Sequence, residues 1–199
     1  MIYQQAIAPE ALRARIECVV IGASAGGVEA LAELLPALPA TFRPSLLIVL
    51  HLPRDRPSLL VDIFAKRCAR PVREADDKEP LEPGTVYFAP PDYHMLVEKD
   101  RQIALSADAP VHFSRPSIDV LFESAADVYG ERLLGIILTG GNEDGAAGLY
   151  GIHQAGGVTV VQQPDSAKVP LMVVSALQRG PADFVLALPE IAQLLGALA

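Results

Sequence analysis

Short continuous runs of apolar residues alternate along this chain with segments whose apolar residues recur every three or four positions. Runs of about 4–8 apolar residues are typical of strands buried in a parallel sheet, and the wider spacing is typical of amphipathic helices. Buried strands are expected at residues 16–21, 45–50, 133–138, 158–161 and 184–187. Helices are expected at residues 28–38, 58–68, 116–129, 144–154, 170–178 and 189–198.

The middle of the chain departs from this alternation. Strand patterns at residues 85–89, 94–98 and 102–106 follow one another without an intervening helix, and a further short strand is expected at residues 72–75. Strands joined directly by turns indicate an antiparallel insert. The complete pattern predicts an α/β fold, a doubly wound and mostly parallel sheet with helices on both faces and a small antiparallel insert. We expect a tail or short leading helix at residues 1–15 and one domain at residues 16–199.

The composition excludes several classes of protein. The chain has 199 residues, of which 51% are hydrophobic and 20% charged, as in a globular domain with a sizeable core. No apolar run reaches the length of a membrane span, and no basic residue precedes the first apolar positions as in a secretory signal. The net charge of −8 makes nucleic acid a poor partner, because phosphate binding needs a basic surface. Cys18 and Cys68 are expected to be small buried hydrophobes, the four histidines show no metal-binding spacing, and a reducing, cytoplasmic setting is favoured.

Gly22-Ala23-Ser24-Ala25-Gly26 lies between the first expected strand and the first expected helix. A G-x-S-x-G pattern in this context is typical of a nucleophile elbow, in which glycines permit a strained turn and the serine is exposed at its tip. The serine would also lie near a helix N-terminus, which can receive an anion. Close packing of helix on strand, or a phosphate-binding loop, would explain the same small residues. A dinucleotide-binding or P-loop motif is not formed.

Two further strands end in residues that would complete a catalytic site. His51 directly follows the strand at 45–50, and Asp144 lies in the loop after the strand at 133–138. Because the carboxyl ends of parallel strands share one edge, Ser24, His51 and Asp144 can converge there. A serine nucleophile needs a base to take its proton, and a carboxylate orients the imidazole. The sequence therefore predicts Ser24 as nucleophile, His51 as general base and acid, and Asp144 as the orienting carboxylate.

Structural alternatives remain open for the triad residues. His51 would also fit as a packed residue at a strand end, and Asp144 as no more than the N-cap of the helix that follows it. Glu143 is a competing carboxylate, which we expect to face water. The order Ser…Asp/Glu…His of the α/β-hydrolases would instead require His153 as the base, within the helix at 144–154.

The two other histidines are expected outside the catalytic site. His94 falls inside the antiparallel insert, and His112 precedes the start of the helix at 116–129 and is expected in a surface loop.

Several separated segments of the chain resemble the CheB-type catalytic domain of chemotaxis protein-glutamate methylesterases. They are GASAGG at 22–27, HLP at 51–53, YFAP at 87–90, HML at 94–96, RPSIDVLF at 115–122, LTG at 138–140 and DGAAG at 144–148. The segments occur in the order of the family, and the resemblance runs from about residue 16 to the end of the chain. It is therefore more specific than the elbow motif alone.

The resemblance implies hydrolysis of glutamate γ-methyl esters on the cytoplasmic helices of bacterial chemoreceptors, with release of methanol. Deamidation of glutamine at such sites is also implied. The expected partner is a methylated chemoreceptor or other signalling protein, with no cofactor, no metal and no membrane insertion, and the expected location is the cytoplasm. By motif matching, Ser24, His51 and Asp144 receive the roles already derived for them.

Two positions depart from the family pattern beside the expected site. Ala25 stands where threonine usually follows the nucleophile, and Gly141 stands where a methionine backbone helps to form the oxyanion hole. Both residues keep a backbone N–H. We therefore expect the amides of Ala25 and Gly141 to bind the oxyanion.

The receiver domain that usually precedes this domain is not present in the sequence, because residues 1–15 are too short to form one. Either the sequence is a fragment or the domain stands alone, in which case a receiver or adaptor would act in trans. Arg54 and Arg56 follow His51 and are expected to dock an acidic substrate protein, although a solvated helix face would also account for them.

Two alternative functions remain beside the methylesterase. One is a small-molecule carboxylesterase with a different triad, and the other is a catalytically weak signalling module of the same fold.

Overall fold

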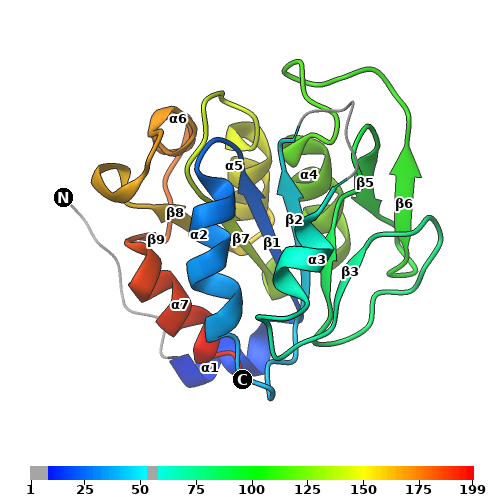
Figure 1. Ribbon diagram of the computed structural model, residues 1–199. Coiled ribbons are helices and arrows are strands. Elements are labelled where there is room, and N and C mark those ends of the chain that lie inside the picture. The colour runs from blue at the N-terminus through cyan, green and yellow to red at the C-terminus, as the bar shows by residue number, and fades with distance from the viewer. Residues whose placement is uncertain (1–8, 53–57) are drawn as a thin grey trace.

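A computed structural model describes residues 9–52 and 58–199. Its centre is a sheet with the strand order β3-β4-β2-β1-β7-β8-β9, and β5 and β6 form a separate two-stranded sheet (Figure 1). Every pairing in the central sheet is parallel, whereas β5 and β6 pair in antiparallel fashion. The predicted fold class, a doubly wound α/β sheet with a small antiparallel insert, is confirmed.

Most elements lie close to the ranges expected from the sequence, but the helix expected at 58–68 covers only Leu60–Phe64. The strands are β1 (Cys18–Ala23), β2 (Ser45–Leu50), β3 (Val72–Glu74), β4 (Val86–Phe88), β5 (His94–Val97), β6 (Ile103–Ser106), β7 (Leu133–Ile137), β8 (Val158–Gln162) and β9 (Phe184–Leu186). The helices are α1 (Pro9–Arg15), α2 (Gly27–Leu34), α3 (Leu60–Phe64), α4 (Ile118–Tyr129), α5 (Ala146–Gln154), α6 (Leu171–Arg179) and α7 (Leu188–Gly196). The helix expected at 28–38 is shorter, because the α-helix changes to a 3-10 turn (Leu35–Ala37) that contains a proline.

The expected position of residues 85–89 in the antiparallel insert is wrong. Strand β4 lies between β3 and β2 and pairs in parallel with both. The physical reason is that β4 is buried on both faces: Val86 and Phe88 pack into one core and Tyr87 into the other. A strand that is apolar on both faces is stable inside a sheet, so only β5 and β6 remain in the insert.

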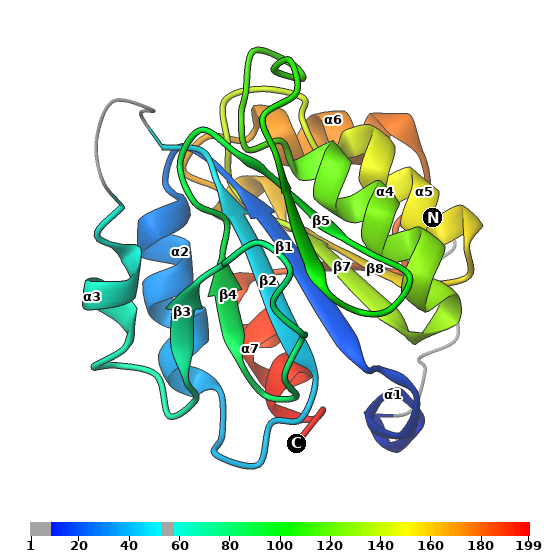
Figure 2. The same cartoon turned by 90° about the vertical axis from the view of Figure 1, so that its right-hand side faces the viewer.

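Different helices cover the two faces of the central sheet. Figure 2 shows α2 and α3 on one side of the sheet and α4 and α5 on the other. Leu31 of α2 and Ile191 of α7 belong to the first core, whereas Phe122 of α4 and Leu149 of α5 belong to the second. Successive residues of each buried strand contribute to opposite cores.

The chain leaves the neighbouring strands β1 and β7 toward opposite faces of the sheet. Strand β1 continues into α2 on the first face, and β7 continues through a loop into α5 on the second. A crevice forms at the carboxyl edge where two adjacent strands diverge in this way, and α/β proteins place their ligands there. The backbone N–H of Ser24 donates to the carbonyl of Thr139 over 3.0 Å, which joins the two diverging loops.

Leu12 of α1 is buried in the first core. The division into a tail of residues 1–15 and a domain of residues 16–199 stays a prediction. Cys18 is buried, as expected, and Cys68 is partly buried. None of the helices in the described part of the chain is both long and apolar enough to cross a membrane.

Candidate active site

Ser24 and His51 lie side by side at the carboxyl edge of the sheet. Ala23 and Leu50 are register partners at the ends of β1 and β2, so each candidate residue is the first beyond a paired strand end. The backbone N–H of His51 donates to the carbonyl of Ala23 over 3.1 Å. Within residues 9–52 and 58–199, no group accepts a hydrogen bond from the Ser24 hydroxyl. Such bonds are often long in free enzymes and tighten when substrate binds.

Ser24 begins a tight turn into α2. The N–H of Gly27 donates to the Ser24 carbonyl over 2.8 Å, and Gly26, the N-cap of α2, has a φ of 83°. This left-handed conformation favours glycine, which explains the last residue of the G-x-S-x-G motif. The hydroxyl of Thr139 holds the other side of the turn by donating to the Ala25 carbonyl over 2.9 Å. The sequence prediction of a strand–turn–helix around Ser24 is therefore confirmed.

The imidazole of His51 is hydrogen-bonded to Asp144. The distance from Nε2 of His51 to Oδ2 of Asp144 is 2.9 Å, and Asp144 is completely buried. Because the Asp144 carboxylate can only accept, Nε2 carries the shared proton and Nδ1 is left with a lone pair. A neutral imidazole in this state can accept one proton from a neighbouring hydroxyl.

Asp144 is held by the first turn of α4. Its carboxylate accepts hydrogen bonds from the Ser117 hydroxyl (2.8 Å), the Ile118 N–H (2.7 Å) and the Asp119 N–H (3.0 Å). The alternative that Asp144 serves only as the N-cap of the helix that follows it, α5, is wrong. The N-cap of α5 is Gly145, and Asp144 instead receives the N-terminal amides of α4, where the helix dipole also favours an anion.

The start of α4 reaches this position because β1 contains a glycine. A Cβ on Gly22 would lie 2.3 Å from Cγ2 of Ile118, a distance that no side chain tolerates. Gly22 therefore permits the close approach that places the N-terminus of α4 beside the ends of β1 and β2.

The environment of Asp144 keeps it ionised. Burial alone would raise the pKa of the Asp144 carboxyl, but the hydrogen bonds from His51, Ile118 and Asp119 outweigh burial, and the pKa is lowered below the ordinary aspartate value. An ionised Asp144 can both orient the His51 ring and stabilise its protonated form.

His94 belongs to the same network, although the sequence placed it only in the insert. It is 2% exposed; Nδ1 accepts from the Ser117 N–H over 3.1 Å, and Nε2 lies 3.1 Å from the Ala109 carbonyl oxygen. The contact between His94 and Ser117 was missed because the packing of β5 against α4 is not visible in local sequence patterns. The role of Ser117 as an N-cap could have been recognised, since a serine before an apolar helical pattern is typical of that position.

The remaining candidate side chains lie elsewhere. Glu143 is largely exposed, as expected, and contacts His112, whose Nδ1 is 3.4 Å from Glu143 Oε1. His112 itself is on the surface and also lies 3.5 Å from Asp119. His153 is near the C-terminal end of α5, where Nδ1 lies 3.9 Å from Oδ2 of Asp183, away from the hydrogen bonds of His51 and Asp144. Arg54 and Arg56 fall outside the described residues.

Hydrogen bonds fix the loop after β7 next to the turn at Ser24. The Thr139 N–H donates to the Gln162 side chain, and the Gly140 N–H donates to the Val169 carbonyl, both over 2.9 Å. A Cβ on Gly140 would lie 3.0 Å from Cβ of Ser24, which shows how closely the loop approaches the elbow. In the described part of the chain, the backbone N–H groups of Ala25 and Gly141 donate to no protein acceptor, so both are available to a ligand.

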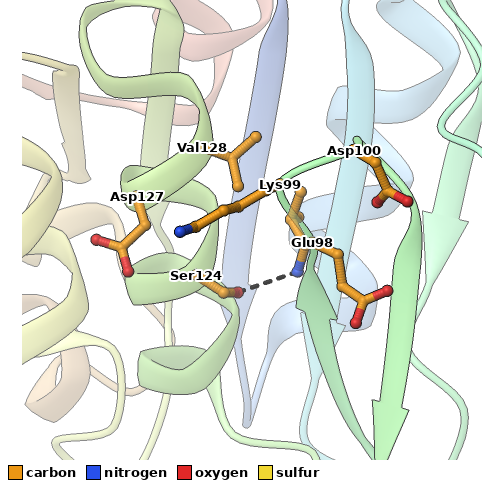
Figure 3. A pocket seen from close by; sticks show the side chains of 7 residues that line it. Glu98, Lys99, Asp100, Ser124, Asp127 and Val128 are labelled. Atoms are coloured by element: carbon orange, nitrogen blue, oxygen red, sulfur yellow. Dashed lines mark hydrogen bonds between the residues drawn. The ribbon is translucent and has the colours of Figure 1, made fainter.

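Among the described residues, one small hollow borders His51. A hollow of about 80 Å³ is lined by His51, Leu52, Phe113, Ser114, Arg115 and Pro116. A hollow of about 590 Å³ lies between the β5–β6 turn and α4, but no triad residue lines it. Figure 3 shows Lys99 extending across this hollow toward α4, and Ser124 accepting the hydrogen bond from the Val97 N–H. Within the described residues, no group of three His, Cys, Asp or Glu side chains is arranged to hold a metal ion.

Comparisons with known proteins identify the family of this chain. The sequence matches the CheB methylesterase family over residues 19–195. A putative protein-glutamate methylesterase/protein-glutamine glutaminase of Leptospira interrogans is 47% identical over 178 residues, which cover 89% of this chain and 92% of the relative. The protein-glutamate methylesterase/protein-glutamine glutaminase of Symbiobacterium thermophilum is 40% identical over 174 residues, which cover 87% of this chain and 48% of that relative.

A solved structure shares the fold over most of the chain. The crystal structure of the Thermotoga maritima CheB methylesterase catalytic domain superimposes with a TM-score of 0.87 and 30% sequence identity, covering 92% of this chain and 99% of that chain. The agreement of sequence, fold and length of match shows that this chain belongs to the CheB methylesterase family.

Proposed function

We propose that this protein is a serine hydrolase that removes methyl groups from glutamate γ-methyl esters of chemoreceptors or related signalling proteins. The observation that carries the proposal is the His51–Asp144 hydrogen bond directly beside Ser24 at the switch point of the sheet. Membership of the CheB methylesterase family supports the choice of ester, and so do the names of the Leptospira and Symbiobacterium relatives.

The proposed reaction has two halves. Nδ1 of His51 takes the proton of Ser24 as Oγ attacks the ester carbonyl, and the oxyanion binds the N–H groups of Ala25 and Gly141. The bond to the methoxy group then breaks, and His51 returns the proton so that methanol leaves. In the second half His51 activates a water molecule, which hydrolyses the acyl-serine and releases the glutamate side chain and Ser24. A glutamine side chain would follow the same steps with ammonia as the leaving group.

The family match favours a protein substrate over a free small molecule, because the relatives that match over most of this chain are named for glutamate residues of proteins. A methyl ester at the end of a glutamate side chain can reach an open site, because the rest of the substrate protein stays outside. The ionised Asp144 and its hydrogen bond to His51 argue against a catalytically weak module.

We extend the proposal to the setting of the reaction. The substrate would be met in the bacterial cytoplasm. Arg54 and Arg56 would dock the acidic substrate near His51, because a chain with a net charge of −8 needs local positive charge to approach it.

The decisive experiment compares two substrates. Purified protein is incubated with a methylated chemoreceptor fragment, and methanol is measured; p-nitrophenyl acetate is assayed in parallel. We expect methanol release that requires Ser24, together with labelling of Ser24 by a fluorophosphonate that requires His51. Hydrolysis of p-nitrophenyl acetate without methanol release would indicate the small-molecule esterase, and the absence of both turnover and labelling would indicate the signalling module.

A further inference from the structure

The first turn of α4 has a partner for each of its leading amides. An α-helix begins with backbone N–H groups that no carbonyl of the helix can accept. In α4, Ile118 and Asp119 donate to Asp144, and Val120 donates to the hydroxyl of Ser117 over 3.5 Å. The N–H of Ser117 itself, at the N-cap, donates to Nδ1 of His94. His94 therefore completes the set of acceptors that fixes the start of this helix.

The two contacts of His94 determine the state of its ring. A backbone N–H can only donate and a carbonyl oxygen can only accept. Nδ1, which faces the Ser117 N–H, must therefore have a free lone pair, and Nε2, which faces the Ala109 carbonyl, must carry the hydrogen. The ring is 2% exposed, so water does not replace either partner. His94 is thus a neutral hydrogen-bond acceptor at the N-terminus of α4.

We propose that His94 is a positioning residue of the esterase site, an inference that rests on the proposed function. His94 holds the backbone of Ser117; the hydroxyl of Ser117 and the next two amides hold Asp144; and Asp144 holds the ring of His51. Among the described residues, no hydrogen bond joins His94 to Ser24 or His51. Through His94, the β5–β6 hairpin becomes part of the scaffold that orients the base.

The proposal assigns different roles to the two ring nitrogen atoms of His94. The effect on His51 passes through Nδ1, because only this atom contacts Ser117, whereas Nε2 contacts the loop carbonyl of Ala109. A displacement of about 1 Å at a catalytic group costs about 100-fold in rate. Loss of the Nδ1 acceptor should therefore reduce turnover, whereas loss of the Nε2 donor alone should not.

A matched pair of variants tests this difference. The side-chain oxygen of asparagine takes the place of Nδ1, so His94→Asn keeps an acceptor for Ser117. The longer His94→Gln carries its amide to the position of Nε2 and leaves the Ser117 N–H without an acceptor. With the methylated receptor fragment, we expect kcat of His94→Asn within about threefold of wild type and kcat of His94→Gln lowered about 100-fold, with KM unchanged in both.

A spectroscopic measurement makes the test independent of activity. In substrate-free protein, the proton shared by Nε2 of His51 and Asp144 is observed by NMR. It should keep its wild-type chemical shift in His94→Asn and shift or disappear in His94→Gln, while circular dichroism shows that both variants are folded. This result would support the positioning role even if the wild type released no methanol, which would contradict the proposed function alone.

Other outcomes would overturn the proposal. Equal changes of kcat in the two variants, or an unchanged His51 proton in a folded His94→Gln, would show that His94 only supports the fold. Should His94→Gln not fold, Ser117→Ala replaces it, because it removes the next link, the hydroxyl that donates to Asp144. An unshifted His51 proton in Ser117→Ala would overturn the proposed chain of contacts, and a shifted one together with an unperturbed His94→Asn would support it.

Discussion

Nε2 of His51 lies 2.9 Å from Oδ2 of Asp144, so in the proposed reaction the ring nitrogen that receives the proton of Ser24 is Nδ1. In the chymotrypsin arrangement the two nitrogen atoms have the opposite assignment, since Nδ1 faces the aspartate and Nε2 the serine. The chemistry is unchanged, because either nitrogen of a neutral imidazole can act as the base.

The first prediction concerns the nucleophile and the base. Ser24→Ala and His51→Ala should each lower turnover by about 10⁴–10⁶-fold, because each removes a participant in the same proton transfer. The double variant should be only slightly slower than either single variant. Methanol release from the methylated receptor fragment measures all three rates. Losses that multiply in the double variant would show that the two residues do not share a step.

Asp144→Asn should lower turnover less, by about 10³–10⁴-fold, because it disturbs the base without removing it. Where the amide nitrogen replaces Oδ2, it faces the N–H of Ile118 and the Nε2–H of His51, two donors that it cannot accept. The His51 ring is then driven toward the tautomer with hydrogen on Nδ1, which cannot take the Ser24 proton. Turnover equal to wild type would exclude Asp144 from the orienting role.

The lowered pKa of Asp144 also predicts a dependence of stability on acid. A carboxyl whose pKa is lower in the folded than in the unfolded state binds fewer protons when folded. Its contribution to the free energy of unfolding is therefore fully present above the unfolded pKa, about 3.9, and is lost as the pH falls through the folded pKa. Below about pH 4 the Tm of wild type should therefore fall more steeply than that of Asp144→Asn. Asp100→Asn, at an exposed turn, is the control. Parallel Tm curves for wild type and Asp144→Asn would contradict the prediction.

The positions of Ser24 and His51 were predictable because they depend on local patterns. Each residue follows a continuous apolar run that forms a buried strand, and β2 has the bounds expected from the sequence. Parallel pairing then brings the two strand ends to one edge without further information. This part of the site is encoded in the length and polarity of two short segments.

Other parts of the site depend on contacts between distant segments. Asp144 precedes α5 in the sequence, yet its carboxylate binds the start of α4, which Gly22 allows to approach β1. His94 reaches Ser117 only because β5 packs along α4. Strand β4 was misplaced for a similar reason, since its parallel pairing with β2 joins segments that are distant in sequence. Local periodicity reports whether a segment is buried, but not against which element.

A prediction for substrate docking concerns Arg54 and Arg56. Reversing both charges, Arg54→Glu with Arg56→Glu, should raise KM for the methylated receptor fragment and leave p-nitrophenyl acetate hydrolysis unchanged. The difference should shrink with added salt, because charges are screened over about 8–10 Å at physiological ionic strength. Arg13→Glu with Arg43→Glu is a matched control, since both residues are exposed and Arg43 precedes β2, whereas His51 follows it. Equal loss on both substrates would indicate damage at His51 instead.

The last prediction tests the oxyanion site at Gly141. A Cβ on Gly141 would lie 3.9 Å from its nearest neighbour, a methyl of Val169, so Gly141→Ala should fit and keep normal turnover through its backbone N–H. Gly141→Pro removes that N–H and should lower kcat about 10²–10³-fold, the usual effect of losing one oxyanion donor. The alanine variant controls for the added side chain, and circular dichroism for folding. If a folded Gly141→Pro variant turned over at the wild-type rate, the oxyanion would have to be bound by other donors, and Gly141 would be eliminated from the site.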